Sequence, residues 1–142
     1  MSAEMITAIG IDIDGTITID PPFFSALARK LRNNGTIVHV VTARDAESRQ
    51  ETEDELFELD IEYDELYFLP PMEIAIAVCP HEELEWFLRH FWFKVDYAQR
   101  NYLSHFIDDN ERVLQLFSLY APEIKAIPVT ERHSLVCEEP PL

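Results

Sequence analysis

Basic residues are scarce in this chain. Lys and Arg together number 11 against 27 Asp and Glu, which gives a formal net charge of −16 at pH 7. A protein that binds the phosphate backbone of a nucleic acid needs a cluster of basic side chains, and none occurs in the sequence. We therefore expect no nucleic-acid backbone binding. Any anionic substrate must be received by a locally placed cation.

Cysteine is equally rare, and long apolar runs are lacking. Cys79 and Cys137 lie far apart, form no CxxC pair and have no histidine at zinc-ligand spacing, which favours free thiols in a reducing compartment. No apolar stretch approaches the roughly 20 residues of a membrane-spanning helix, and residues 1–4 do not begin a signal peptide. These absences predict a soluble, cytoplasmic protein with no membrane partner.

The sequence does contain a regular alternation of strand-like and helix-like segments. Its 142 residues suffice for one ordinary domain, so we expect a single domain over 1–142. Apolar and β-branched runs predict strands at 5–14, 36–42, 65–69, 105–107 and 124–129. Helices are predicted at 23–34, 46–59, 81–93, 95–103 and 111–120. This alternation predicts a three-layer α/β/α domain with a Rossmann-like, mostly parallel sheet.

Acidic and hydroxyl side chains follow three of the predicted strands. Asp12 and Asp14 come at the end of the first, Thr42 ends the second, and Asp108 with Asp109 follows the fourth. Taken singly, each of these side chains is also explained as the cap of the helix that follows its strand. Because the carboxyl ends of parallel strands share one edge of the sheet, we expect these side chains to meet there. Their carboxylates would repel one another, so the pattern predicts a divalent-cation site.

The segment 70–93 is longer than the alternation of strands and helices requires. Its second half predicts a helix with an unusually aromatic face, formed by Trp86, Phe87, Phe91, Trp92 and Phe93. An aromatic stripe at helical spacing usually packs, which favours extra core or a homodimer contact. The functional alternative is a small lid over the active edge of the sheet.

Four ordered motifs resemble those of the haloacid dehalogenase (HAD) superfamily, whose members are mostly magnesium-dependent phosphatases. Asp12-Ile13-Asp14-Gly15-Thr16 resembles the first motif, and Thr42 in Val40-Val41-Thr42-Ala43-Arg44 resembles the second. Lys94 is the candidate third motif and Asp108-Asp109 the fourth. The resemblance spans most of the chain. It implies a HAD-like fold with a minimal cap, because the segments 16–22 and 70–93 are too short for a full one.

The resemblance implies roles for the matching residues in hydrolysis of a phosphomonoester. Asp12 is expected to be the nucleophile that forms an aspartyl-phosphate, and to contact Mg²⁺. Asp14 is expected to bind the ion through its backbone carbonyl and to act as general acid and base. The Thr42 hydroxyl and the Ala43 N–H are expected to bind a phosphate oxygen. Gly15 belongs to the same phosphate site, since its backbone can approach a ligand closely.

Three cations are candidates for holding the phosphate. Lys94 is one of only three lysines in the chain and is expected to hold the phosphate and the nucleophile together. Arg89 or Arg100 is the substitute if the helix places either one better. Arg44 either adds a charge beside Thr42 or pairs at the surface with Glu47.

The metal ligands are expected among Asp12, Asp14, Asp108 and Asp109. The resemblance implies that Asp109 contacts the ion directly, with Asp108 behind it or sharing the site. The expected cofactor is Mg²⁺.

The predicted function is a Mg²⁺-dependent phosphatase whose substrate is a phosphorylated small molecule or a phosphate presented on a macromolecule, because so small a cover leaves the site open. One alternative is a catalytically silent HAD-like binding or regulatory domain, which is favoured if Lys94 points away from Asp12. The other is a receiver-like signalling domain, which also gathers acids, a threonine and a lysine at one sheet edge. It needs a phospho-acceptor aspartate after a central strand, and none follows 65–69.

Overall fold

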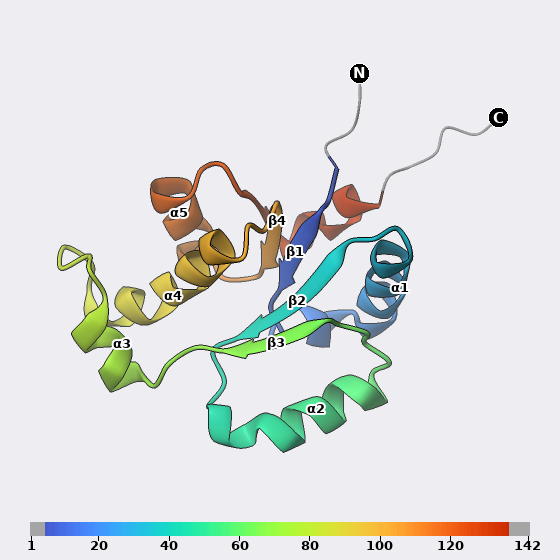
Figure 1. Ribbon diagram of the computed structural model, residues 1–142, viewed down its shortest axis with the longest axis horizontal. Coiled ribbons are helices and arrows are strands. Elements are labelled where there is room, and N and C mark those ends of the chain that lie inside the picture. Colours follow the sequence, from blue (N-terminus) through green and yellow to red (C-terminus); the bar gives the residue numbers. More distant parts are fainter. Residues whose placement is uncertain (1–4, 137–142) are drawn as a thin grey trace.

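A five-stranded sheet lies at the centre of the computed structural model, which describes residues 5–136 (Figure 1). The strands are β1 (Ala8–Ile11), β2 (Ile37–Thr42), β3 (Glu65–Phe68), β4 (His105–Asp108) and β5 (Lys125–Pro128). They lie in the order β3-β2-β1-β4-β5, and every neighbouring pair is parallel. The prediction of a mostly parallel sheet is confirmed, and β1 is its central strand.

Strand β1 is shorter than the predicted range 5–14, because its pairing with both neighbours ends at Ile11. The Asp12 N–H still donates to the Ile107 carbonyl at 3.1 Å, after which the chain turns away from the sheet. Asp12 therefore stands at the carboxyl end of the central strand. Asp14 lies beyond the strand, in the turn that follows it.

Helices cover both faces of the sheet, which confirms the three-layer architecture (Figure 1). On one face lie α1 (Pro21–Asn33), α2 (Arg49–Glu58) and the 3₁₀ segment η3 (Val129–Leu135). On the other lie α4 (Trp86–Arg100) and α5 (Glu111–Tyr120). Phe24 of α1 shares a buried cluster with the isoleucines of β1, whereas Phe106 of β4 packs on Phe117 of α5 with ring centroids 4.7 Å apart. Burial of each such side chain contributes about 1.5–3 kcal/mol.

The shorter elements lie near the carboxyl edge of the sheet or beyond β3. They are the 3₁₀ segments η1 (Ile17–Ile19) and η2 (Ala46–Ser48), and the short helix α3 (Met72–Val78). The predicted helix 46–59 is thus divided into η2 and α2. Asp45 caps η2, since its side chain accepts a hydrogen bond from the Glu47 N–H at 2.9 Å.

The two helices predicted at 81–93 and 95–103 are one helix, α4. It begins later than expected, at Trp86, because Arg89 donates to the carbonyls of Glu82 and Leu84 and thereby holds 81–85 in a turn. It continues through Lys94, a straight-chain residue that a helix accommodates well. His90, Lys94 and Ala98 form a buried row along one face of α4.

The aromatic face of 81–93 divides between buried and exposed positions. Phe91, Trp92 and Phe93 are half-buried against the cluster between α4, α5 and the sheet, whereas Trp86 is 59% exposed. Helix α3 packs against α4 at this end of the molecule (Figure 1). Whether the segment acts as a lid or a dimer contact stays a prediction.

Residues 5–136 contain no helix with the length and apolar character that crossing a membrane would require. Cys79 is a buried free thiol, and Cys137 lies outside the described residues. The sequence predicts a frayed tail at 137–142, and this segment also lies outside the described residues.

Candidate active site

Lys94 links two buried carboxylates at the carboxyl edge of the sheet. Its Nζ donates to Asp12 Oδ1 at 2.9 Å and to Asp108 Oδ2 at 2.6 Å. Asp12 follows β1, Asp108 ends β4, and Lys94 reaches them from the middle of α4. The three side chains are 8%, 0% and 3% exposed, respectively. An ammonium group is thus fixed beside the residue expected to be the nucleophile.

Burial dominates the electrostatics of this triad. It raises the pKa of Asp12 to about 7, although the neighbouring Lys94 opposes the shift. The pKa of Asp108 is raised for the same reason. Burial by itself would lower the pKa of Lys94, but the carboxylates of Asp108 and Asp12 outweigh it and the net shift is upward. The lysine is therefore charged. The buried carboxylates beside it still lack enough positive charge to balance them.

Asp109 completes a group of acids that can hold a metal ion. Oxygen atoms of Asp12, Asp108 and Asp109 all lie within 4.8 Å of one another. Carboxylate oxygens are the donors that Mg²⁺ prefers. Three carboxylates face the single ammonium of Lys94, so a divalent cation would balance the remaining charge. The donor set and the charge balance both fit this ion.

Thr16 and Gly15 hold the acids in place. The Thr16 hydroxyl lies 3.1 Å from Asp12 Oδ2 and 3.4 Å from Asp109 Oδ1, and its single proton can serve either carboxylate. Gly15 has a φ of +82°, and a Cβ at this position would collide with the Asp109 carboxylate. The first motif therefore needs glycine for two independent reasons.

We expect Gly15→Ala to displace Asp109 and to strain the backbone, at a cost of about 1–3 kcal/mol in the free energy of unfolding. Denaturant unfolding monitored by circular dichroism measures the change. Gly35→Ala is the matched control, since Gly35 also has a positive φ of +91° but a Cβ there would meet nothing within 4 Å. If the two variants lose the same stability and retain the same affinity for Mg²⁺, the contact with Asp109 plays no part.

Asp14 and Arg44 form a bidentate ion pair. Arg44 Nε donates to Asp14 Oδ2 at 2.9 Å and Nη2 donates to Asp14 Oδ1 at 2.8 Å. Arg44 Nη1 also donates to Glu55 Oε1 of α2 at 2.9 Å. The expectation that Arg44 pairs with Glu47 is wrong, and its guanidinium is not free beside Thr42. The hydrogen bond from Arg44 lowers the pKa of Asp14, so this carboxylate is ionised in the structure.

The second motif lies at the end of β2. Thr42 is buried, and its hydroxyl accepts a hydrogen bond from the Arg44 N–H at 3.1 Å. This bond shapes a tight turn in which the exposed Ala43 leaves the sheet edge. The two other candidate cations are elsewhere: Arg89 is bound to the carbonyls before α4, and Arg100 is paired with Asp96 at 3.0 Å. Lys94 is the candidate that contacts Asp12.

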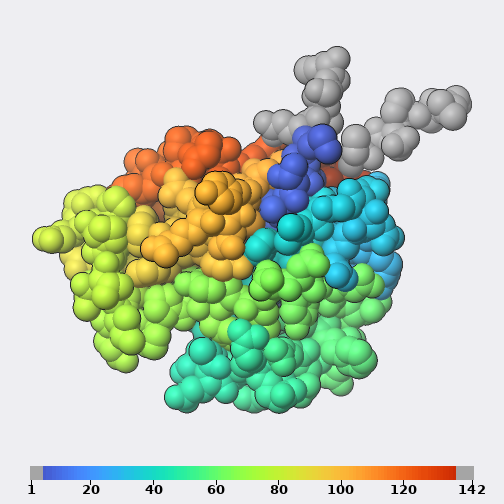
Figure 2. All heavy atoms as spheres, in the orientation of Figure 1, coloured from blue at the N-terminus to red at the C-terminus, as the bar shows by residue number. Residues whose placement is uncertain are grey.

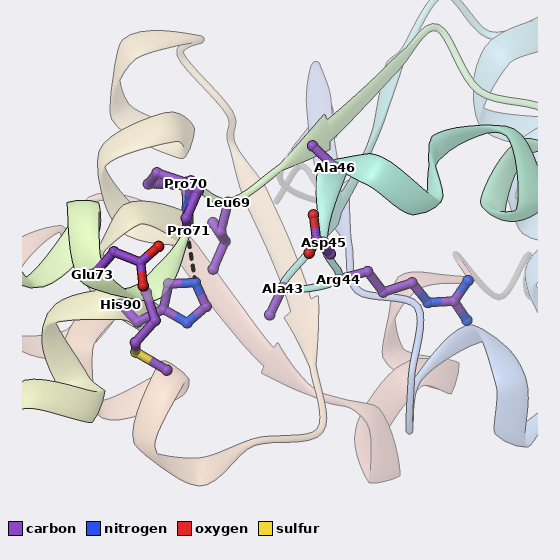
Figure 3. Close-up of a pocket in the computed structure, with 10 residues that line it drawn as sticks. Ala43, Arg44, Asp45, Ala46, Leu69, Pro70, Pro71, Glu73 and His90 are labelled. Atoms are coloured by element: carbon purple, nitrogen blue, oxygen red, sulfur yellow. Dashed lines mark hydrogen bonds between the residues drawn. The ribbon is translucent and has the colours of Figure 1, made fainter.

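A pocket of about 330 Å³ opens beside this turn (Figure 3). Figure 3 shows the His90 ring on one side of it and Ala43 and Asp45 on the other. The remaining wall comes from the segment that links β3 to α3 and from the start of α3 itself, with Leu69, Pro70, Pro71, Met72 and Glu73. In Figure 2 the surface is hollowed between α3 and the start of α2.

Two residues of this region have no counterpart in the predicted site. His90 lies four residues before Lys94 in a helix, so helical spacing is a signal that can find it. No sequence signal connects Glu55 with Arg44, because their pairing depends on how α2 packs beside the turn after β2.

A comparison with protein families finds no match, and neither does a comparison with curated protein sequences. Two solved structures of the Pnkp1/Rnl/Hen1 RNA repair complex do contain a similar chain. The first matches at 14% identity over 90% of this chain and 45% of that chain, with a TM-score of 0.59. The second matches at 14% identity over 89% and 47%, with a TM-score of 0.60.

This chain has a haloacid dehalogenase-like fold. The expectation drawn from the four motifs is thereby confirmed for the fold. The chain spans somewhat less than half the length of the two matching chains, and 14% identity carries nothing beyond the fold. A putative 3-deoxy-D-manno-octulosonate 8-phosphate phosphatase from Vibrio cholerae matches at 13% identity over 80% of this chain and 61% of that chain, with a TM-score of only 0.45.

Proposed function

We propose that this protein is a Mg²⁺-dependent phosphatase that hydrolyses a phosphomonoester through an aspartyl-phosphate on Asp12. The observation that carries the proposal is the contact of Lys94 Nζ with both Asp12 and Asp108 in a buried position. A fixed ammonium at this point can bind a phosphate oxygen and hold the nucleophile in line with phosphorus. The HAD-like fold and the adjacent group of three acids support the same function.

In the proposed reaction one Asp12 oxygen attacks phosphorus. The bond from phosphorus to the ester oxygen breaks as the bond to Asp12 forms, and the leaving alkoxide takes a proton from Asp14. Asp14 then accepts a proton from water, which attacks the phosphorus and releases inorganic phosphate and free Asp12. Thr42 and the Ala43 N–H are proposed to bind the phosphate during both steps.

To act as the general acid, Asp14 must break its ion pair with Arg44. Its side chain is 63% exposed and is paired with Arg44, whose hydrogen bonds keep the carboxylate ionised. Proton donation therefore requires Asp14 to leave Arg44, to take up a proton from solvent and to turn towards the leaving oxygen. Substrates whose leaving group needs no proton, such as aryl phosphates, avoid this requirement and suit a first assay.

Asp12, Asp108 and Asp109, with the backbone carbonyl of Asp14, are the groups proposed to hold Mg²⁺. The bound ion would supply positive charge to the phosphate oxygens. Within the chain, Thr16 keeps the Asp12 carboxylate oriented and Lys94 balances part of the charge of the acids.

The two alternatives fit the structure less well. A silent binding domain is favoured if Lys94 points away from Asp12, whereas the two side chains are in contact at 2.9 Å. A receiver-like domain needs its acceptor after the third strand, at the centre of the sheet, whereas here the third strand, β3, lies at the edge and the first strand, β1, is central. A nucleic-acid substrate is not carried over from the RNA repair complex, because the chain has a net charge of −16.

We expect the protein to hydrolyse p-nitrophenyl phosphate with Mg²⁺ and to lose at least about a hundredfold in turnover with excess EDTA. Mg²⁺ at 100 times its dissociation constant should also stabilise the fold by about 2.7 kcal/mol, which thermal unfolding measures as a shift of a few degrees. Asp109→Asn should raise the Mg²⁺ concentration for half-maximal activity about tenfold or more. The exposed Asp54→Asn is the matched control. Absence of turnover across a panel of phosphomonoesters, or turnover indifferent to EDTA, would contradict the proposal.

A further inference from the structure

The pocket beside the turn after Thr42 is positioned to receive the leaving group of the substrate. His90, on its wall, lies one helical turn before Lys94 on the same face of α4, which corresponds to about 6 Å along the helix. Ala43, on the opposite wall, directly follows Thr42. A phosphate held between Lys94 and Thr42 would therefore lie beside this pocket. This inference rests on the proposed phosphatase function.

Apart from Arg44, the polar side chains that line the pocket can accept hydrogen bonds. The carboxylates of Asp45 and Glu73 are both exposed at its rim. His90 Nε2 lies 3.0 Å from the Pro70 carbonyl, and because a carbonyl only accepts, Nε2 carries the proton. Burial lowers the pKa of His90, so the ring is neutral and its Nδ1 is an acceptor.

Arg44, the one cationic side chain that lines the pocket, is already bound to two carboxylates. Figure 3 shows the Arg44 side chain extending away from His90 and the two prolines, and its guanidinium is bound to Asp14 and Glu55. The rest of the lining is apolar, from Ala43, Leu69, Pro70 and Met72. The pocket thus offers two negative charges, no available positive charge and a small apolar surface.

We propose that the leaving group is a short amino alcohol, whose ammonium group lies two or three carbon atoms from the ester oxygen. The ammonium would be received by Glu73 and Asp45, and its carbon chain would contact the prolines. At a volume of about 330 Å³ the pocket is at the small end of ligand sites, which suits a group of this size. Leaving groups that carry a carboxylate or a second phosphate are disfavoured by the same two acids.

Three esters of equal length and different charge test the proposal. These are O-phosphoethanolamine, the monophosphate of ethylene glycol, and 2-phosphoglycolate. We expect kcat/KM to fall in this order, by about fivefold at each step, because exposed ion pairs contribute modestly. The difference should shrink in 0.5 M NaCl, where charges at the rim are screened.

Substitutions of Glu73 and Asp45 test whether these two acids cause the preference for O-phosphoethanolamine. Glu73→Gln and Asp45→Asn should each raise the KM for O-phosphoethanolamine about fivefold more than the KM for p-nitrophenyl phosphate, whose leaving group carries no positive charge. Asparagine retains the capping hydrogen bond at position 45. Glu58→Gln, an exposed site on α2 that does not line the pocket, is the matched control.

The outcomes separate this proposal from the phosphatase function. If p-nitrophenyl phosphate is hydrolysed but the three esters react equally, or 2-phosphoglycolate reacts fastest, the assignment of an amino alcohol is overturned and the phosphatase function stands. An equal loss for every substrate in Glu73→Gln would also overturn it. If p-nitrophenyl phosphate is not hydrolysed at all, the function itself fails.

Discussion

Replacing Asp12 with asparagine is expected to lower the turnover of p-nitrophenyl phosphate at least about a thousandfold while the protein remains folded. An amide oxygen is a poor nucleophile, and removing a nucleophile abolishes the covalent route whatever else the site retains. The shape of the side chain is preserved. Its oxygen can still accept from Lys94, and its amide can donate to the Thr16 hydroxyl.

The same variant has a predictable effect on stability. The folded protein holds the Asp12 proton up to a pKa of about 7, whereas the ordinary value is 3.8. The folded state therefore binds more protons than the unfolded chain between these limits, and the contribution of Asp12 to stability falls as the pH rises through this window. Asparagine has no proton to lose. The variant should gain stability over the original protein from about pH 4 to pH 7, and the difference should be constant outside that range.

Thermal unfolding at pH 4, 5.5, 7 and 8, without metal, measures this difference. Mg²⁺ should reduce it, because the ion favours ionised Asp12 in the original protein alone. Asp54→Asn serves as the control for loss of an exposed carboxylate. Retention of turnover in Asp12→Asn would eliminate Asp12 as the nucleophile, and a variant that melts lower at every pH would show that its charge is needed for folding.

The parallel sheet and its acidic edge can be predicted from the sequence because both depend on local patterns. β-branched runs such as the one at β2 define strands, and alternation with helices defines a parallel sheet. Residues that follow successive parallel strands must meet at one edge, which brings Asp12 and Asp108 together. The fold class and the succession of most elements along the chain were therefore predictable, whereas the helix α3 and the single long helix α4 were not.

The ion pairs of Arg44 were not predictable, because they depend on packing between elements distant in sequence. The contact of Lys94 with Asp12 was expected only from the motif resemblance. Arg44 bonds Asp14 and Glu55, which are 30 and 11 residues away in opposite directions along the chain. Lys94 reaches Asp12 only because α4 runs uninterrupted through position 94. The pocket likewise needs both α3 and the turn after β2, and no single segment contains its pattern.

Replacing Lys94 with methionine is the prediction with the largest combined effect on activity and stability. Methionine matches the length of lysine but leaves Asp12 and Asp108 without their shared cation, in positions 8% and 0% exposed. Breaking a buried ion pair by removing one partner costs about 3–5 kcal/mol. We also expect turnover to fall at least about a thousandfold, since the phosphate loses the charge that holds it against Asp12.

The cost of Lys94→Met should depend on pH in a defined direction. Lys94 opposes the upward pKa shifts of Asp12 and Asp108, so without it both pKa values rise further and the folded variant takes up protons more readily. The variant should therefore be least stable at pH 8 and recover as the pH falls towards 5, where protonation removes the buried charges.

Lys30→Met, at an exposed site on α1, is the matched control and should behave as the original protein. The double variant Lys94→Met with Asp108→Asn should regain part of the stability at pH 8, because one buried charge is gone, but none of the turnover. If Lys94→Met is as stable at pH 8 as the original protein, Lys94 does not compensate these acids. If Lys94→Met is active, Lys94 does not have the role that the proposed function assigns to it.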